Sequence, residues 1–572
     1  MYHLKITRPE VWGGIESTIN RVGDQYKDQL EYSGHYQRHG DIREFANLGI
    51  SSIRYPVLWE RHQKDKDSKI TWDWTAGQLK AIRAAGLNPI VGFVHHGSGP
   101  PFTHLLDPGF PRLLAGYAYE VASHFPWVRD YTPVNEPLTT ARFSGLYGHW
   151  FPHCKDENSF YRMLLNQLKG TVLAMKAIRA VNPNARLIQT EDLGKTHSTE
   201  FLGYQAEFEN NRRWLTFDIL TGLLKPGHVQ YNNILDCGIN EDDIAFFREH
   251  KMKPDILGLN YYITSERWLD EAVGKYPRDI HGGNGRHAYV DTEVVRANPS
   301  ARAGFKKLGQ EAWDRYEIPI AVTEAHLHCT REEQLRWFRE IWDDACALST
   351  AGVSVIAVTA WALLGSFDWD TLLTKTGTLY ESGVFDIKTF PGQLRRTALA
   401  KLIQNIASNI FDWHPLLSEK GWWHPEDESD KYSDRNLVII IETISNKNSN
   451  DNNPENLQRL FSDACRQRRI PYITVHRSNE RRIWGAKPWA IINISGKETY
   501  LSRICADMGI QYVDFSGEEI EDGSLNICVE DLPMTIHQVH KVLDLLIDEE
   551  TGLWVFDSRK TSFKSPELVV ID

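Results

Sequence analysis

Eight short apolar runs of β type, separated by longer stretches of helical spacing, restrict the fold of this chain more than any other feature. They lie within roughly the first 400 residues. In order, they are VWGG from 11, SIRYPV from 52, PIVGFVHH from 89, YTPVNE from 131, ARLIQTE from 185, ILGLNYY from 256, IPIAVTE from 318 and VIAVTAW from 355. Alternating strands and helices are typical of a parallel α/β sheet, and eight such units predict a closed (β/α)8 barrel, the TIM barrel.

Polar and aromatic side chains stand at the ends of these runs, where a barrel of this kind places its reactive groups. Glu136 ends the fourth run and Glu324 ends the seventh, so both should face the same mouth. A lone carboxylate there can be a hydrogen-bonded structural group, but two carboxylates about 5 Å apart are typical of retaining glycoside hydrolysis. Groups suited to a sugar accompany them at His95, Asn135, Tyr262, Trp361 and Trp369.

Composition restricts the kinds of partner that the protein can bind and the cellular compartment in which we expect it. The 572 residues include 64 basic and 76 acidic side chains, a formal net charge of -12, which disfavours nucleic acid or an anionic membrane as main partner. The seven cysteines are scattered and never form CxxC, which favours reduced thiols over disulfides or a zinc site. The N-terminus lacks a signal-peptide pattern, and no apolar run reaches about 18 residues. We therefore expect a cytoplasmic protein without a metal.

Six motifs, taken in chain order, resemble those of glycoside hydrolase family 1, the β-glucosidase family, over roughly the first 400 residues. They are RYPVLWER from 54, FVHH from 93, TPVNEP from 132, GLNYY from 258, AVTEAH from 321 and WALLGSFDW from 361. The resemblance implies that Glu136 is the acid/base and Glu324 the nucleophile. It also implies that Arg54 and Tyr262 support the nucleophile, and that no cofactor or metal takes part.

The resemblance further assigns a group of side chains to the substrate. These are Asn20, His95, His96, Asn135, His326, Trp361, Asp368 and Trp369. Among them, Asn135 would contact the sugar 2-hydroxyl and Trp361 would stack on the sugar. His95 would also contact the sugar, and Trp369 would form a further wall of the pocket.

Several of these positions depart from the family pattern. Asn20 replaces a glutamine and Asp368 a glutamate, and both normally hold the distal hydroxyls of the glycone. Each is one methylene shorter, which withdraws its polar head by about 1.5 Å and leaves room for a different sugar. His96 replaces a tryptophan, and Ala325 and His326 replace the usual Asn-Gly. We therefore expect a non-standard glycone.

Two classes of function follow from these residues. The first is a retaining β-glycosidase or transglycosidase, a hydrolase of O-glycosyl bonds acting on a small glycoside or an oligosaccharide. The second is a catalytically weak carbohydrate-binding or scaffolding protein built on the same barrel. The sequence leaves open the glycone, the aglycone, the acceptor and the oligomeric state.

Two other features of the barrel region have no role from the resemblance. Glu191 and Asp192 form an acidic pair at the end of the fifth run, where they either bind the far end of the substrate or hydrogen-bond loop backbone. The segment HGGNGRHAYVD, residues 281–291, is rich in Gly and His without the spacing of metal ligands, which favours an active-site lid.

The chain changes character after Ile410. We expect a barrel domain at 1–410, a linker at 411–435 and a small Rossmann-like α/β domain at 436–572. The segments ICADMGIQYVDFSGEEIEDG and LPMTIHQVHKVLDLLIDEETGLWVF resemble parts of dTDP-4-dehydrorhamnose reductases. However, ETISNKNSNDNNPEN after LVIII has no glycine for a pyrophosphate, and Tyr-x-x-x-Lys is absent after 436. We therefore expect a degenerate domain that binds no dinucleotide and serves structure or partner binding.

A group of arginines lies in this second region. They are Arg466, Arg468, Arg469, Arg477, Arg481 and Arg482. They either form a solvated basic face or bind an anion.

Overall fold

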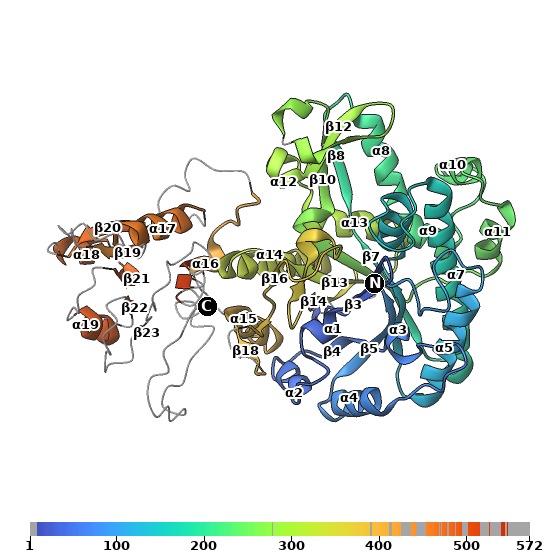
Figure 1. Cartoon of the computed structure of the whole chain (residues 1–572), viewed down its shortest axis with the longest axis horizontal. Coiled ribbons are helices and arrows are strands. Elements are labelled where there is room, and N and C mark those ends of the chain that lie inside the picture. The colour runs from blue at the N-terminus through green and yellow to red at the C-terminus, as the bar shows by residue number, and fades with distance from the viewer. Residues whose placement is uncertain are drawn as a thin grey trace. The chain divides into compact units, whose positions relative to one another are not determined.

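The computed structural model describes most of the barrel region and separate segments after it (Figure 1). The described residues are 8–276, 278–388, 392–410, 415–424, 436–441, 454–467, 470, 472–477, 480–486, 488–494, 501–508, 510–514, 525–526, 539–540, 542–543 and 546. The chain divides into two compact units. The first holds most residues up to Trp413, and the second holds the remainder together with Cys329–Leu335 and Thr397–Leu402.

Eight parallel strands close into a barrel, as the sequence predicted. Around the barrel they are β1 (Glu10–Gly14), β14 (Val355–Ala360), β13 (Ile320–His326), β9 (Ile256–Tyr262), β7 (Arg186–Asp192), β6 (Asp130–Asn135), β5 (Asn88–His95) and β4 (Ser52–Pro56). β1 pairs with both β14 and β4, which closes the sheet. Each predicted run coincides with one of these strands, so the TIM-barrel prediction is confirmed.

Apolar side chains fill the inside of the barrel and hold helices against its outside. Trp12, Ile90, Ile188 and Ile256 form one buried interior cluster with two alanines. The helices around the barrel include α4 (Asp73–Ala84), α5 (Phe110–His124), α7 (Glu157–Val181), α9 (Leu215–Thr221), α11 (Glu241–Glu249) and α13 (Gly304–Tyr316). In α5, buried Leu114, Ala118 and Val121 recur at the helical period, and this face packs against α7.

Further helices lie in the same part of the chain. They are α1 (Gln29–Tyr32), α2 (Asp41–Ala46), α3 (Trp59–His62), α6 (Pro137–Ala141), α8 (Gly203–Arg212), α10 (Tyr231–Asp236) and α12 (Val294–Ala297). After them come α14 (Arg331–Thr350), α15 (Ala398–Ala407) and α16 (Pro415–Ser418). None of the helices in the described parts of the chain is long and apolar enough to cross a membrane.

A separate four-stranded sheet follows the ends of two barrel strands. Its order is β11 (His281–Gly283), β12 (Ala288–Glu293), β10 (Glu266–Asp270) and β8 (Lys195–Ser198). The segment expected to be a lid forms the β11–β12 hairpin of this sheet, and its turn uses Gly285 at a φ of 78°. Its action as a lid stays a prediction.

The second unit contains a parallel five-stranded sheet. The strands, in spatial order, are β20 (Tyr472–His476), β19 (Asn436–Ile441), β21 (Pro488–Asn493), β22 (Gln511–Asp514) and β23 (Leu525–Asn526). Its helices are α17 (Pro454–Gln467), α18 (Glu480–Gly485) and α19 (Leu501–Met508). Ile439 packs with Phe461 of α17, whereas Val438 and Ile440 pack with Leu501 of α19, so both faces are covered.

This strand order, 2-1-3-4-5 in chain numbering, is a doubly wound order. It differs from the usual Rossmann order 3-2-1-4-5-6, so a reductase origin stays a prediction. Residues 442–453, where a phosphate turn would lie, are outside the described part of the chain. Of the predicted arginine group, the described side chains are those of Arg477 and Arg482.

Candidate active site

Glu136 lies at the junction between β6 and α6. Its backbone is left-handed, with φ 43° and ψ 61°, a conformation that costs a non-glycine residue roughly 1–3 kcal/mol. Pro137 follows as the first residue of α6, where a fixed φ suits a helix start. The side chain is buried, with 5% exposed. A buried carboxyl group is therefore held at the C-terminal end of the barrel on a strained backbone.

Glu324 lies on β13, near its end, and is also buried. Arg54 of β4 donates from Nη1 to Glu324 Oε1 over 2.7 Å, and the Tyr262 hydroxyl of β9 donates to Oε2. A second bond from Arg54 Nη1, also 2.7 Å, reaches the carbonyl of Thr323. Both oxygens of Glu324 therefore have donors that stabilise a negative charge.

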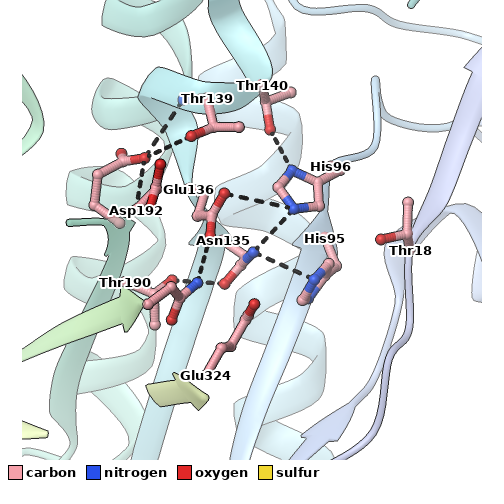
Figure 2. Close-up of polar contacts among 12 residues, drawn as sticks. Thr18, His95, His96, Asn135, Glu136, Thr139, Thr140, Thr190, Asp192 and Glu324 are labelled. Carbon is pink, nitrogen blue, oxygen red and sulfur yellow. Dashed lines mark hydrogen bonds and ion pairs between the residues drawn. The ribbon is translucent and has the colours of Figure 1, made fainter. Parts of the chain in front are cut away.

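The surroundings of Glu136 are different. Asn260 of β9 donates from Nδ2 to Glu136 Oε1 over 2.5 Å, and His96 Nε2 lies 3.7 Å from Oε2. Figure 2 shows Glu136 and His96 together with Asn135, His95 and Glu324 in one region of the site. Glu136 is thus held by a neutral amide beside an imidazole.

Asn135 joins the two glutamates into one network. Its Oδ1 accepts bonds from Arg54 Nη2 (2.7 Å) and Thr190 Oγ1 (2.8 Å). Its Nδ2 lies 3.3 Å from His95 Nε2 and 3.4 Å from His96 Nε2 (Figure 2). Because Oδ1 is the acceptor, Nδ2 donates and both imidazole Nε2 atoms accept.

Different surroundings act on the pKa values of the two glutamates. Burial, followed by the charges of Glu324, Asp192 and Glu191, raises the pKa of Glu136 well above its ordinary value. Burial also raises the pKa of Glu324, but Arg54 and Tyr262 oppose that rise. Glu136 is therefore the group that keeps a proton, and Glu324 is the group that ionises first.

The two histidines are neutral. Burial, followed by the repulsion that a protonated His95 would feel from a protonated His96 and from Arg54, lowers the pKa of His95 well below its ordinary value. Burial and Arg54 lower the pKa of His96 to about 3. Both rings therefore take part as hydrogen-bonding groups at neutral pH.

Aromatic rings line the same region. The Trp361 and His95 rings are stacked, with centroids 5.6 Å apart and planes 8° apart, and the Arg54 guanidinium lies 4.8 Å from the Trp361 centroid. The ring of Trp369 meets His96 edge-on at 5.5 Å. A small cavity is lined in part by Arg54, His95, Asn135 and Trp361.

His326 is engaged with a carboxylate. Its Nε2 lies 3.1 Å from Glu381 Oε2, and both side chains are buried. The His326 hydrogen bond and charge oppose burial and hold the pKa of Glu381 below its ordinary value. Its predicted contact with substrate stays a prediction.

Asn20 and Asp368, predicted to hold distal hydroxyls, have opposite surroundings. Asn20 is fully buried, and neither its Oδ1 nor its Nδ2 has a hydrogen-bond partner among the described residues. The Asp368 carboxylate accepts bonds from the backbone amides of Gly377 (3.0 Å), Thr378 (2.7 Å) and Leu379 (3.4 Å). The Asn20 amide is therefore unsatisfied among the described residues, whereas Asp368 anchors a loop.

We expect Asp368→Ala to lower the free energy of unfolding by about 2 kcal/mol, because several loop donors lose their acceptor. Urea unfolding measures the change. The neighbouring Asp370 is exposed and accepts one bond from the Thr378 hydroxyl, so Asp370→Ala is a matched control, with a loss below about 0.5 kcal/mol. Equal stability of the two variants would contradict the anchoring role.

Glu191 also holds backbone. Its carboxylate accepts bonds from the Leu138 amide (3.0 Å) and Thr139 amide (3.4 Å) of α6, and from the Thr216 hydroxyl (2.6 Å). Burial raises its pKa to about 7. Of the two roles open from the sequence, these contacts favour the structural one, and they fix the helix that begins beside Glu136.

The sequence reasoning missed Glu16. This buried residue follows β1, and burial and Glu324 raise its pKa to about 7. Its Oε1 accepts bonds from the Thr18 amide (2.9 Å) and hydroxyl (2.6 Å) and lies 3.9 Å from His95 Nε2. The strand-end rule that found Glu136 and Glu324 could have found Glu16, two residues beyond the first strand.

Comparisons with known proteins bear on the fold. No family model matches the chain. A family 1 β-glucosidase from Thermotoga maritima is similar in structure, with a TM-score of 0.57, 16% identity, and coverage of 70% of this chain and 98% of that chain. The β-glucosidase from that organism in complex with cyclophellitol is similar with a TM-score of 0.56 and 15% identity, and the match covers 71% of this chain and 98% of that chain. At this identity the likeness establishes a shared barrel fold.

Within the described residues, no group of three or more His, Cys, Asp or Glu side chains is arranged to hold a metal ion.

Proposed function

We propose that this chain is a retaining β-glycosidase, with Glu324 as nucleophile and Glu136 as acid/base. The observation that carries the proposal is the unequal surroundings of two buried carboxyl groups in one barrel mouth. Glu324 receives hydrogen bonds from Arg54 and Tyr262, whereas Glu136 has an amide donor and negative neighbours. One group is suited to attack and the other to proton donation. The barrel shared with β-glucosidases supports this assignment.

In the first step, ionised Glu324 attacks the anomeric carbon while the bond to the leaving oxygen breaks. Glu136 gives its proton to that oxygen, so the aglycone departs neutral and a glycosyl ester remains on Glu324. Arg54 and Tyr262 favour the charged form of Glu324 before attack. Burial keeps the proton on Glu136 until it is needed.

In the second step, Glu136 is a carboxylate and removes a proton from water. The water oxygen attacks the anomeric carbon on the face opposite Glu324, and the ester bond breaks. Two inversions at the anomeric carbon leave its configuration unchanged overall. A sugar hydroxyl in place of water gives transglycosylation by the same step, so the residues serve either acceptor.

The remaining predicted residues form the substrate pocket in this proposal. Asn135, fixed by Arg54 and Thr190, lines the cavity and holds the His95 and His96 rings, and Trp361 supplies a flat apolar surface. The others are His95, His96, His326, Trp369, Asn20 and Asp368. Because loop amides occupy the Asp368 carboxylate, the far end of the glycone is recognised differently from a glucose site, which favours a non-standard sugar.

A panel of 4-nitrophenyl β-glycosides tests the proposal. We expect turnover of at least one member, and proton NMR during early turnover should show the β-anomer of the free sugar before mutarotation. Initial α-anomer would indicate an inverting enzyme. Sugar binding without turnover of any member would favour the carbohydrate-binding alternative.

A further inference from the structure

His96 lies beside the candidate acid/base, although the family resemblance assigned it to the substrate. It directly follows β5 with a left-handed φ of 53°, and its side chain is buried. The rings of His95, Trp150 and Trp369 surround its own ring, with centroids 4.9, 5.4 and 5.5 Å away. The turn and these contacts hold the imidazole in one orientation.

Both ring nitrogens of His96 have polar neighbours in the protein (Figure 2). Nδ1 lies 3.0 Å from Thr140 Oγ1, and Nε2 lies 3.4 Å from Asn135 Nδ2 and 3.7 Å from Glu136 Oε2. Thr140 is one helical turn after Glu136, because its amide donates to the Glu136 carbonyl over 2.9 Å. The ring therefore spans these two residues, and its nitrogens are engaged with protein groups.

The hydrogen bonds of Asn135 determine which nitrogen of His96 carries the hydrogen. The Arg54 guanidinium can only donate, so Asn135 Oδ1 accepts and Asn135 Nδ2 donates to His96 Nε2. A ring nitrogen that accepts has no hydrogen of its own. The hydrogen of the neutral ring is therefore on Nδ1, where Thr140 Oγ1 accepts it, and the Nε2 lone pair faces Glu136.

The two oxygens of Glu136 have different neighbours. Asn260 donates to Oε1 over 2.5 Å, whereas no donor among the described residues reaches Oε2. A lone pair repels a carboxylate oxygen but attracts the hydrogen of a neutral carboxyl group. His96 Nε2 therefore favours a protonated Glu136 with its hydrogen on Oε2. At 3.7 Å it forms no full hydrogen bond, so that hydrogen is free to leave.

We propose that His96, held by Thr140, is a positioning residue that keeps the catalytic proton on Oε2 of Glu136. This inference rests on the proposed glycosidase function. The proton passes from Oε2 to the leaving oxygen in the first step, and a proton from water returns to Oε2 in the second. His96 stays neutral in both steps. The tryptophan of the family pattern could not act in this way, because an indole nitrogen only donates.

Other charged and titratable groups face Glu136 and His96 from several strands. They are Arg54 on β4, His95 on β5, Glu191 and Asp192 on β7, Tyr262 on β9 and Glu324 on β13. A substitution of His96 leaves all of them in place. A change in proton donation can therefore be assigned to the imidazole.

Nitrogen NMR of the protein with isotope-labelled histidine rings tests the tautomer without any turnover. The signals that disappear in His96→Gln belong to His96. Near neutral pH they should show a protonated Nδ1 and an unprotonated Nε2. A protonated Nε2, alone or together with Nδ1, would overturn the proposal.

Thr140→Val tests how the ring is held. It removes the acceptor of the Nδ1 hydrogen, so part of the His96 population should shift to the form protonated on Nε2. Thr171→Val on α7 is the matched control, because Thr171 is also buried and its hydroxyl donates to the Gln167 carbonyl. The control should keep the wild-type signals. An unchanged tautomer in Thr140→Val would refute the role of Thr140.

Leaving groups of unequal acidity test the effect on proton donation. His96→Gln places an amide near Oε2 that can donate to it and stabilise the carboxylate. With an alkyl glycoside, kcat/KM should fall at least about tenfold more than with the dinitrophenyl glycoside of the same sugar, which needs no proton. Equal losses would indicate a lost sugar contact and overturn the proposal. His124→Gln, exposed at the end of α5, should leave both values unchanged.

Infrared spectra separate this inference from the proposed function. If no glycoside is turned over, the glycosidase proposal fails, and the carbonyl band of the neutral Glu136 carboxyl group still reports its proton. This band is identified by its absence in Glu136→Gln. It should weaken in His96→Gln at neutral pH, with the melting temperature as a check on folding. A band of unchanged intensity in His96→Gln would count against the positioning role.

Discussion

Glu324→Ala should lower kcat/KM on an activated aryl β-glycoside by about 10⁴-fold or more, because the covalent route is lost. Removal of the carboxylate leaves a space on the face from which Glu324 attacks. Azide placed there should restore part of the rate and give the α-glycosyl azide, since a single displacement inverts the anomeric centre. Steady-state kinetics and NMR of the azide product measure the two effects.

The hydrogen bond from Tyr262 to Glu324 allows a second variant to be compared with Glu324→Ala. Tyr262→Phe removes one hydrogen-bond donor but leaves the nucleophile, so its loss should be smaller, about 10²-fold, with no azide product. Glu120→Ala on α5 should retain wild-type activity, because the side chain is exposed. A β-glycosyl azide from Glu324→Ala would show that another residue forms the covalent bond.

The barrel could be predicted because its signal is local. Each of the eight strands is a short run of mostly buried and apolar residues, several of them end in polar side chains, and the order of the runs fixes the parallel topology. The same pattern placed Glu136 and Glu324 at one end of the barrel. Arg54 and Tyr262 came from the family resemblance, and their contacts with Glu324 are now seen.

Other parts of the site depend on backbone turns that the sequence pattern does not encode. His96, Glu136 and Asp368 all have positive φ values, which non-glycine residues rarely adopt. The left-handed turn at Asp368 directs its carboxylate to the loop that follows, although its position in the motif suggested a sugar ligand. The charge environment of Glu16 likewise depends on residues far away in the chain.

Substitution of Glu136 should produce an effect that depends on the leaving group. Glu136→Gln keeps the size of the side chain but has no proton to give. With an alkyl glycoside, whose leaving oxygen needs a proton, kcat/KM should fall about 10³-fold to 10⁴-fold. With a dinitrophenyl glycoside, whose leaving group departs as an anion, the fall should be less than about tenfold. The ratio of the two losses isolates proton donation from binding.

The pH profile tests the same assignment. Because Glu136 must be protonated in the first step, kcat/KM should decline as pH rises through its pKa, which burial and the charges of Glu324, Asp192 and Glu191 raise well above the ordinary value. This basic limb should disappear in Glu136→Gln. Glu191→Gln removes one negative neighbour of Glu136, so the basic limb should shift to lower pH. The Gln side-chain oxygen can still accept the hydrogen bond from the Leu138 amide. A limb that persists in Glu136→Gln would assign the proton to a different group.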